Sequence, residues 1–368
     1  MAGAIGTVRT EGMVSPAYIV AVPNDKVDPL FMDYYVKMDR TVQYIHRQSY
    51  GVTDFRLRLY WDSFVTIPCV LPPLAEQRKI AKIHATQDRV IELKKKLLEE
   101  TKKRKKALLK MLMDPTEMKR LEAASPHVST KRLEAASPRG EAASCRFGDG
   151  IWQKLNFGDC FHLLRTNTYS REFMVSGSRG IANIHYGDVL SKFDSILDFS
   201  CTEVDSLVAN APIIGDLLED GDIVIADTAE DFSCGKAVEI HALGKRKAVA
   251  GLHTIACRPV AGCFKPKWIG YFINSEAFHG QLLPLMVGSK VSSITRQSLL
   301  STIVVLPPLP IQRRIATMLS AADREIDLLR QDLEQEERRK KALMQLLLTG
   351  IVRVKEAAGS RFSTREGQ

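Results

Sequence analysis

This 368-residue chain has little of what marks a membrane, secreted or zinc-binding protein. No stretch reaches 18 consecutive apolar residues, so no segment is predicted to span a bilayer. The first residues, MAGAIGTVRTEGM, have no basic segment followed by an apolar one, so we predict no secretory signal. The seven cysteines include no Cys-x-x-Cys pair, which disfavours a disulfide framework and a structural zinc site. We therefore expect a cytoplasmic protein.

The usual signatures of catalysis are missing as well. The chain has no GxxxxGKS or GxxxxGKT phosphate loop and no GxGxxG turn. Pro-Pro pairs occur only in the two LPPL segments, 71–74 and 306–309, where Leu stands in place of the Asn or Asp of an amino-methyltransferase motif. No histidine pairs with a cysteine at metal-ligand spacing. We expect no catalytic residue, metal site or cofactor in this chain.

One segment, 219–231, concentrates carboxylates and keeps an enzyme as an alternative. A Mg²⁺-dependent nuclease needs two or three converging acids and a lysine, and Asp222, Asp227 and Glu239 are the candidates. However, Glu239-Ile240-His241 follows the strand-like run IVIA, where such an enzyme has Glu-x-Lys. The sequence favours a hairpin turn leading into a buried strand.

The charge is unevenly distributed. The formal net charge is +9, and residues 75–113 contain 13 Lys or Arg against 5 Asp or Glu, whereas 310–348 contain 8 against 7. This excess favours a polyanion or an acidic protein as a partner. A solvated helix face would account for the same charges, so both interpretations stay open.

Nearly the same sequence occurs twice, 235 positions apart. Residues 71–115 align without a gap with 306–350, and 20 of the 45 positions are identical. LPPLAEQRKIA in the first copy matches LPPLPIQRRIA in the second, and both copies contain KKAL near their ends. Chance would give only about two or three identities, so the chain contains an internal duplication.

Each copy is predicted to form one long helix. Residues 75–113 and 311–348 contain neither Gly nor Pro and are rich in Lys, Arg, Glu, Leu and Ala. Apolar residues recur every three or four positions and form a narrow seam, although Lys94 and Lys105 interrupt it. We therefore expect the two helices to pack as an antiparallel coiled coil. About 39 residues at ~1.5 Å each span ~58 Å, which would suit a rigid spacer between two domains.

The segments ahead of the two helices correspond more loosely. Both 12–70 and 251–305 predict a strand, a helix, a glycine turn, a polar stretch and a second strand. The predicted fold class is α+β, with mixed α/β globular parts joined to the coiled coil. The predicted organisation comprises a globular back half at 1–70, a helix at 71–115, a low-complexity linker at 116–148, a complete domain at 149–305, a second helix at 306–350 and a disordered tail at 351–368.

Polar and basic stretches of the 149–305 domain are candidates to enter a DNA groove. Lys and Arg hold phosphates, while Asn, Ser, Thr and Arg can also contact base edges. An ordinary surface loop remains the alternative for each stretch. The candidate residues are Arg165, Asn167, Tyr169, Arg171, Lys245, Arg246, Lys247, Lys290, Ser292, Ser293, Thr295 and Arg296.

A globular part ending in LPPL-x-x-Q-x-x-I-A, followed by a long helix and duplicated as a whole, resembles the specificity subunit of type I restriction–modification systems. The resemblance covers 12–115 and 149–350. It implies a non-catalytic subunit in which two target-recognition domains each contact half of a split sequence in double-stranded DNA. It also implies partners: methylation subunits that use S-adenosylmethionine and an ATP-dependent restriction subunit.

The chain departs from this family at its first domain. Only 70 residues precede the first helix, against 157 in 149–305, so roughly the front 87 residues of the first recognition domain are absent. Three outcomes stay open. The shortened domain could be completed by another chain, the subunit could self-dimerise, or the protein could be a non-functional remnant that associates only through its helices.

Overall fold

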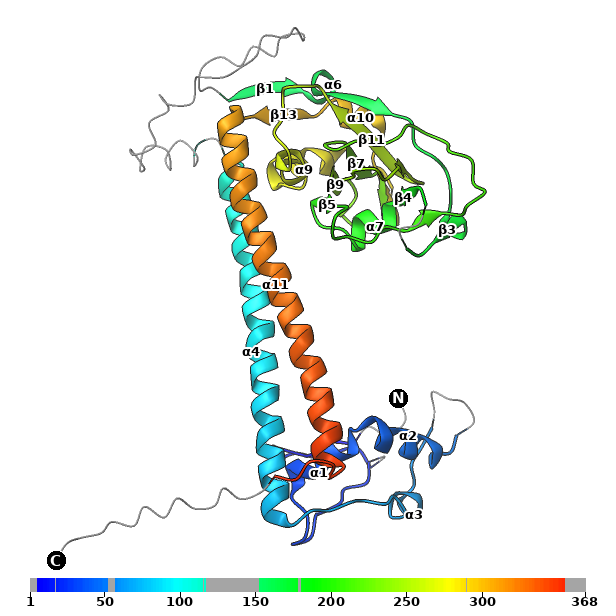
Figure 1. The fold of residues 1–368 in the computed structure, drawn as a ribbon, viewed down its shortest axis with the longest axis vertical. Coiled ribbons are helices and arrows are strands. Elements are labelled where there is room, and N and C mark those ends of the chain that lie inside the picture. Colours follow the sequence, from blue (N-terminus) through cyan, green and yellow to red (C-terminus); the bar gives the residue numbers. More distant parts are fainter. Residues whose placement is uncertain are drawn as a thin grey trace, which may run out of the picture. The chain divides into compact units, whose positions relative to one another are not determined.

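The computed structural model describes residues 5–16, 18–51, 57–114, 116, 152–177, 180–288 and 290–354 (Figure 1). The predicted linker, apart from residue 116, and most of the predicted tail therefore lie outside the described residues. The chain divides into two units, and both long helices contribute to each. Unit 1 comprises residues 1–100 and 326–368, and unit 2 comprises residues 101–325.

Unit 1 is helical throughout its assigned elements. These are α1 (Pro29–Val36), α2 (Asp39–Arg47), α3 (Trp61–Phe64), the first part of α4 (Leu74–Leu112) and the last part of α11 (Leu309–Leu348). Helix α1 begins with proline, whose missing N–H costs nothing there, and the Asp28 carboxylate accepts a hydrogen bond from the Phe31 N–H at 2.9 Å. The core between these helices contains Phe31, Tyr35, Ile80 and Leu348.

Unit 2 is built around a five-stranded sheet with the order β2–β11–β7–β9–β5. Its strands are β2 (Phe161–Leu164), β5 (Ile196–Asp198), β7 (Ile223–Ala226), β9 (Ala237–His241) and β11 (Thr254–Pro259). Strand β11 pairs antiparallel with β2 on one side and with β7 on the other. The predicted strand IVIA forms β7, and all four of its residues are buried.

A second sheet of unit 2 has the order β10–β4–β6–β3, and two ribbons, β1–β13 and β8–β12, lie beside the sheets. The remaining strands are β1 (Gln153–Asn156), β3 (Met174–Val175), β4 (Ala182–Ile184), β6 (Ser206–Leu207), β8 (Thr228–Ala229), β10 (Ala248–Ala250), β12 (Ser292–Ser293) and β13 (Ile303–Leu306). The helices are α6 (Phe157–Cys160), η2 (Arg171–Phe173), α7 (Tyr186–Ser191), α8 (Trp268–Ile273), α9 (Glu276–Leu282), η3 (Leu283–Leu285) and α10 (Arg296–Leu300).

Two strands that the repeat predicts in unit 1 do not form. Residues 18–22 and 65–70 have no strand, whereas their counterparts in unit 2 are β11 and β13. The prediction was wrong because a strand needs a neighbour. Strand β11 lies between β2 and β7, and β13 pairs with β1, but the described residues of unit 1 supply no equivalent of these partners.

The prediction of two antiparallel long helices is confirmed. Helix α4 has 39 residues and α11 has 40. In unit 1, the Lys94 ammonium lies 2.8 Å from Asp332 and 2.9 Å from Glu336. In unit 2, Lys105 pairs with Asp323. The two lysines that interrupt the apolar seam of α4 therefore bind acids of α11, and part of the basic excess of α4 is balanced by its partner helix.

The duplication extends to individual hydrogen bonds. Asp323 accepts a bond from the Tyr271 hydroxyl and pairs with Lys105 in unit 2. At the repeated positions in unit 1, Asp88 accepts a bond from the Tyr34 hydroxyl and pairs with Lys340. Each aspartate thus fastens one short helix and one long helix to its own long helix. The aspartate and the lysine of this triad are therefore among the identical positions of the two helices.

One buried residue of α4 breaks the repeat and provides a test. His84 is fully buried against the Tyr34 ring, and neither ring nitrogen has a hydrogen-bond partner among the described residues. Its repeat counterpart is Leu319, which is also fully buried. Burial lowers the pKa of His84 from its ordinary value of 6.5, although the nearby Asp88 opposes this effect.

The substitution His84→Leu is expected to stabilise unit 1 by about 1 kcal/mol at pH 7.5, because it removes two unpaired polar atoms from the core. The advantage should grow as the pH falls below 6.5, because the unfolded histidine then binds a proton that the folded one does not. Urea unfolding at pH 7.5 and 5.5 measures this, and His46→Leu, at an exposed position of α2, is the control. A stabilisation that does not change with pH would contradict the expected titration.

Candidate nucleic-acid interface

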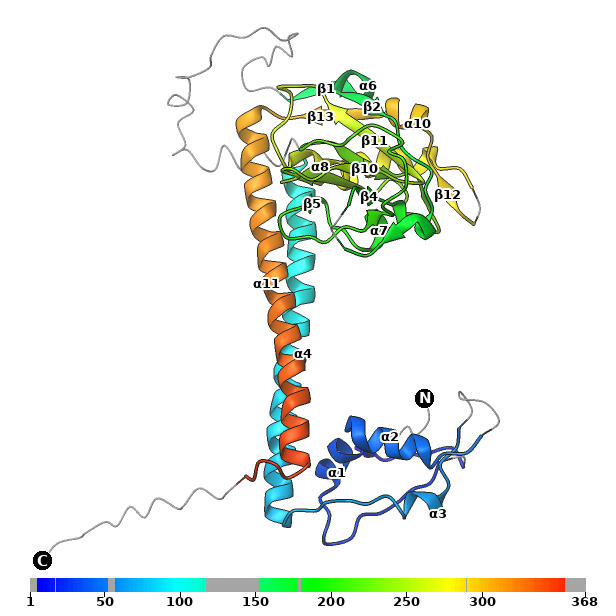
Figure 2. The same ribbon diagram turned by 45° about the vertical axis from the view of Figure 1, so that its right-hand side comes forward.

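The three candidate segments all lie in unit 2, at strand ends and in loops. Residues 165–171 follow β2, residues 245–247 form the turn between β9 and β10, and residues 290–296 include β12 and the first residue of α10. Figure 2 shows β12 and α10 on the same side of unit 2, to the right in that view. The structure can therefore show which of these side chains are available to a ligand and which hold the fold.

Most polar groups of the 165–171 segment bind other parts of unit 2. The Arg165 guanidinium binds the Asp216 carboxylate through two N–H groups, at 3.0 and 2.8 Å, and this pairing lowers the pKa of Asp216. Asn167 is buried, and its side chain donates to Asn183 at 2.9 Å and accepts from the Tyr169 N–H at 3.0 Å. We therefore assign Asn167 to positioning the loop and not to contacting a base.

Arg171 also forms ion pairs within unit 2. Its guanidinium lies 2.8 Å from Asp188, which is buried, and 3.8 Å from Asp205. A buried carboxylate requires such a partner, because an unpaired charge in the interior is costly. The half-exposed Arg171 side chain still presents a positive group at the surface.

The turn 245–247 is fully exposed and lies apart from the other two segments. Its Lys247 carbonyl accepts a hydrogen bond from the Ala182 N–H, which places the turn at the start of the parallel β4–β10 pair. The Arg246 guanidinium lies 5.7 Å from the centre of the Phe199 ring. The turn is therefore a basic part of the surface whose side chains make few contacts with the rest of unit 2.

The segment 290–296 is well anchored, and its charged ends remain free. Ser292 and Ser293 pair with β8, and the Thr295 hydroxyl accepts from the Ser298 N–H at 3.0 Å, capping α10. The Lys290 and Arg296 side chains are exposed, and neither forms a side-chain hydrogen bond or an ion pair with another described residue. A fixed backbone with two unengaged cations is suited to binding an anion.

A series of backbone hydrogen bonds brings two of the three segments together. The Asn167 N–H donates to the Ala250 carbonyl at the end of β10. Three residues later, the His253 carbonyl accepts from the Asp227 N–H, and the Asp227 carbonyl accepts from the Ile294 N–H. Residues 165–171 and 290–296 therefore flank residues 250–253, whereas 245–247 lies at the opposite end of β10.

Between the two segments lies a group of residues that sequence reasoning missed. The His253 ring meets the Tyr186 ring edge-on at 5.3 Å, and its Nδ1 lies 3.6 Å from Asp227. His185 packs against Tyr186 at 4.6 Å, and burial lowers the pKa of His185, which favours the neutral form. These residues come from three separate segments of the chain, so no sequence spacing could have revealed them.

The carboxylates considered for a nuclease are dispersed in the structure. Asp222 is buried and accepts two hydrogen bonds from the Arg258 guanidinium, at 2.9 and 2.8 Å. Glu239 is buried and accepts from the Lys267 and Gly270 N–H groups at the start of α8, and burial raises its pKa to about 7. Among the described residues, no group of three His, Cys, Asp or Glu side chains could hold a metal ion.

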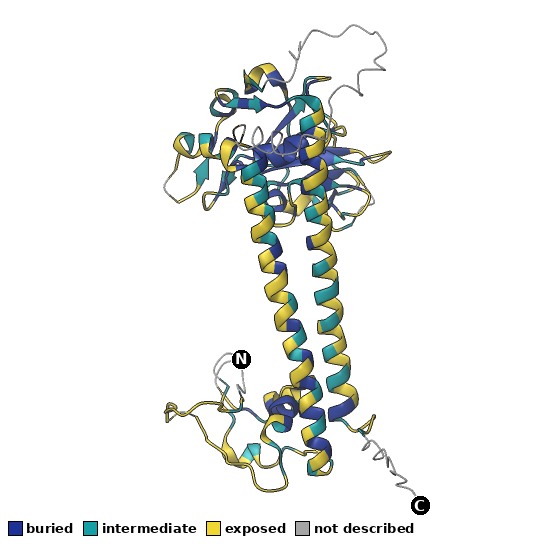
Figure 3. Cartoon of the chain, turned by 90° about the vertical axis from the view of Figure 1, so that its left-hand side faces the viewer, coloured by how far each residue is buried: buried dark blue, intermediate teal, exposed yellow. Residues whose placement is uncertain are grey.

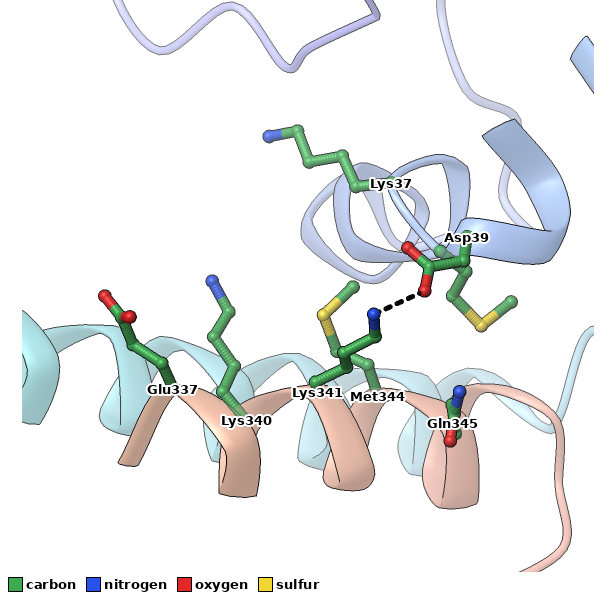
Figure 4. Close-up of a pocket in the computed structure, with 8 residues that line it drawn as sticks. Lys37, Asp39, Glu337, Lys340, Lys341, Met344 and Gln345 are labelled. Carbon is green, nitrogen blue, oxygen red and sulfur yellow. Dashed lines mark ion pairs between the residues drawn. The ribbon is translucent and has the colours of Figure 1, made fainter. Parts of the chain in front are cut away.

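Unit 1 has one shallow hollow, between the α1–α2 junction and α11, and its charged residues pair with one another. Figure 4 shows the Lys341 side chain reaching Asp39, with an ion pair of 2.9 Å. Lys37 pairs with Asp33, and Lys340 pairs with Asp88. These charged side chains are therefore paired within unit 1. No helix among the described residues is long and apolar enough to cross a membrane.

Residues 220–338 match the family described as the type I restriction modification DNA specificity domain. This part of the chain is therefore similar to the type I DNA specificity domain. The matched range runs from the turn before β7, through β12 and α10, into α11. It therefore contains two of the three candidate segments, 245–247 and 290–296.

Curated specificity subunits are similar along most of the chain. The MjaVIII specificity subunit of Methanocaldococcus jannaschii is 26% identical over 352 residues, which cover 94% of this chain and 75% of that protein. The putative MjaX specificity subunit of the same organism is 26% identical over 341 residues, covering 90% and 70%. One solved structure is also similar; it is described as the structural basis of complex assembly and conformational transition of the type I R-M system. Its chain is 18% identical to this one, with a TM-score of 0.50, and the match covers 88% of this chain and 72% of that chain, which supports a shared fold.

Proposed function

We propose that this chain supplies the DNA sequence choice of a type I restriction–modification complex. In this proposal, unit 2 contacts one half-site of a bipartite target in double-stranded DNA. The paired helices scaffold the S-adenosylmethionine-dependent methylation subunits and the ATP-dependent restriction subunit, and their length sets the spacing. The chain itself contributes recognition and no catalytic residue.

The observation that carries the proposal is the convergence of 165–171 and 290–296 around residues 250–253. Lys290 and Arg296 are exposed residues of a segment that is held by β8 and by the Thr295 cap. An arginine on a fixed backbone can donate two hydrogen bonds to a guanine edge, and a lysine can neutralise a phosphate. The half-exposed imidazole of His253 lies between the two segments.

The arrangement predicts different consequences for different candidates. The Arg165 and Arg171 guanidinium groups are bound to aspartates, so each presents a positive charge but is not free to reorient. Asn167 affects DNA binding only indirectly, by holding its loop in place. Lys290 and Arg296 have no such constraint. We therefore expect base discrimination to depend most on Arg296, and general affinity to depend on Lys290.

The double substitution Lys290→Ala with Arg296→Ala is expected to weaken binding of the preferred duplex by about 10- to 100-fold and to relax the preference at one or two positions. The matched control, Lys245→Ala with Lys247→Ala, removes two exposed cations at the other end of β10 and should leave the preference unchanged. Selection from a random duplex pool, using the complex with its methylation subunits, measures both effects.

The outcomes separate the alternatives. If the double variant selects the same sequence as the unaltered chain, the assignment of 290–296 is wrong. If the unaltered chain enriches no sequence, the protein is a remnant that retains only helix-mediated association. Methyl transfer to unselected DNA should persist in both variants, because the chain contributes no catalytic group to that reaction.

A further inference from the structure

His253 stands in a turn where its backbone conformation is costly. Its φ is +54°, a left-handed value that glycine adopts easily and that a residue with a Cβ atom rarely adopts. Strands β10 and β11, which flank the turn, are mostly buried. Figure 3 shows such buried strands at the centre of unit 2. His253 itself is exposed, and strained residues of this kind gather at binding sites.

The turn is held by backbone hydrogen bonds to the loop after β7. The Asp227 N–H donates to the His253 carbonyl at 3.1 Å. The Asp227 carbonyl accepts from the Ile294 N–H at 2.9 Å. One residue therefore connects His253 to the segment 290–296, which the proposed function assigns to DNA binding. These bonds fix the backbone of His253 relative to that segment.

The His253 ring has an acid beside one of its two nitrogens. Nδ1 lies 3.6 Å from an oxygen of the Asp227 carboxylate, and the Thr228 hydroxyl donates to the same oxygen at 2.8 Å. A distance of 3.6 Å is too long for a hydrogen bond, but the negative charge still favours a proton on the nearer nitrogen. In the neutral ring Nε2 then has the free lone pair. Nε2 forms no hydrogen bond with another described residue, and 48% of the side chain is exposed.

Two further titratable groups face the ring, both at the start of α7. The Tyr186 ring meets the His253 ring edge-on at 5.3 Å. His185 interacts with His253 electrostatically, and burial lowers the pKa of His185, so His185 is mostly neutral near pH 7. Among the described residues that face His253, Asp227 is therefore the main charged group. Its negative charge favours the protonated imidazole.

We propose that His253 is a specificity-determining residue of unit 2 that contacts a base edge through Nε2, a role that rests on the proposed function. Neutral His253 accepts a hydrogen bond from an exocyclic amino group, which adenine and cytosine present in the major groove. Protonated His253 donates instead, and guanine presents two acceptors there, O6 and N7. Because histidine changes charge between about pH 5 and 8, the preferred base at one position depends on pH. Lysine and arginine stay charged over this range, so Lys290 and Arg296 would not produce the same change.

The test is selection from a random duplex pool at pH 8.0 and 6.0, using the full chain in complex with its methylation subunits. At one position, the ratio of guanine to adenine or cytosine should rise about 10-fold at the lower pH, because one good base contact replaces another. His253→Gly removes the imidazole and suits the left-handed turn, so the variant should fold. It should lose the preference at that position at both pH values and keep the preferences at the others. Far-UV circular dichroism at both pH values verifies folding.

Two further variants test the chemistry. Asp227→Asn keeps an oxygen for the Thr228 hydroxyl but removes the charge that favours the imidazolium, so the change of preference should move to lower pH. His162→Gln is the matched control, because His162 is also an exposed histidine but lies opposite Arg258, toward the other end of β11. It should leave the preference and its pH dependence unchanged.

Four results would overturn the role of His253 while the proposed function stands. The unaltered chain could select the same sequence at both pH values, or His253→Gly could retain every preference. His253→Gly could also weaken the binding of all sequences equally, which would indicate a phosphate contact, or Asp227→Asn could leave the pH dependence where it was. If the unaltered chain enriches no sequence at either pH, both the role of His253 and the proposed function are wrong.

Discussion

Asp222→Ala is expected to lower the free energy of unfolding of unit 2 by about 3 kcal/mol. The carboxylate is 1% exposed, and it accepts two hydrogen bonds from Arg258 and a third from the Glu219 N–H at 2.7 Å. Removing it leaves a partly buried guanidinium without its main counter-charge and a turn N–H without its acceptor. Arg258 keeps partial access to water, so the effect falls at the lower end for a buried ion pair.

Chemical unfolding monitored by tryptophan emission measures this loss, because Trp268 is fully buried in the core of unit 2. Glu219→Gln is the matched control. Glu219 pairs with the same arginine at 2.9 Å but is largely exposed, so its loss should cost well under about 1 kcal/mol. If Asp222→Ala left stability unchanged and instead abolished a Mg²⁺-dependent DNA cleavage by the isolated chain, the nuclease alternative would replace the structural role.

The second large effect is expected for Gln312→Leu, which should destabilise unit 2 by about 3 kcal/mol or more. Gln312 is fully buried near the start of α11, in unit 2. Its side-chain oxygen accepts from the Lys265 N–H at 2.8 Å, and its amide donates to the Cys263 and Pro307 carbonyls at 3.2 and 2.9 Å. Leucine has nearly the same volume but would leave these three buried backbone groups unpaired.

Denaturant unfolding compares this variant with Gln335→Leu, at an exposed position of the same helix, which should change stability by less than about 0.5 kcal/mol. The repeat offers an independent replicate. Gln77 accepts from the Asp28 N–H at 2.8 Å and donates to the Lys26 and Pro72 carbonyls, so Gln77→Leu should destabilise unit 1 similarly. If neither Gln312→Leu nor Gln77→Leu lowered the free energy of unfolding, the glutamine would not be what attaches each long helix to the globular part beside it.

The repeated motif was readable from sequence because its chemistry is local. LPPL-x-x-Q predicted a helix start, and Gln77 and Gln312 bond to backbone within the same short junction. The ranges without Gly or Pro, 75–113 and 311–348, lie within two residues of the ends of α4 and α11, because both residues disfavour a helix interior. The seam also predicted an antiparallel pair, although the ion pairs of Lys94 and Lys105 were not anticipated.

The candidate site was predictable only in part. The sequence identified exposed cations such as Lys290 and Arg296, because loop composition favours exposure. It also proposed Asn167 as a base-reading residue, and the structure buries that amide against Asn183. Burial of a polar loop residue depends on neighbours far away in the chain. For the same reason His253, Tyr186 and Asp227 could not be grouped from their spacing.

The sequence by itself determined the duplication, the two long helices and the kinship with specificity subunits, because these depend on periodicity and on short motifs whose interactions are local. Tertiary structure decided which strands exist and which polar side chains are free. The loosely corresponding segments 18–22 and 254–258 show the reason. A strand obtains its hydrogen bonds from other strands, so β11 forms between β2 and β7, whereas its counterpart remains exposed where no described neighbour meets it.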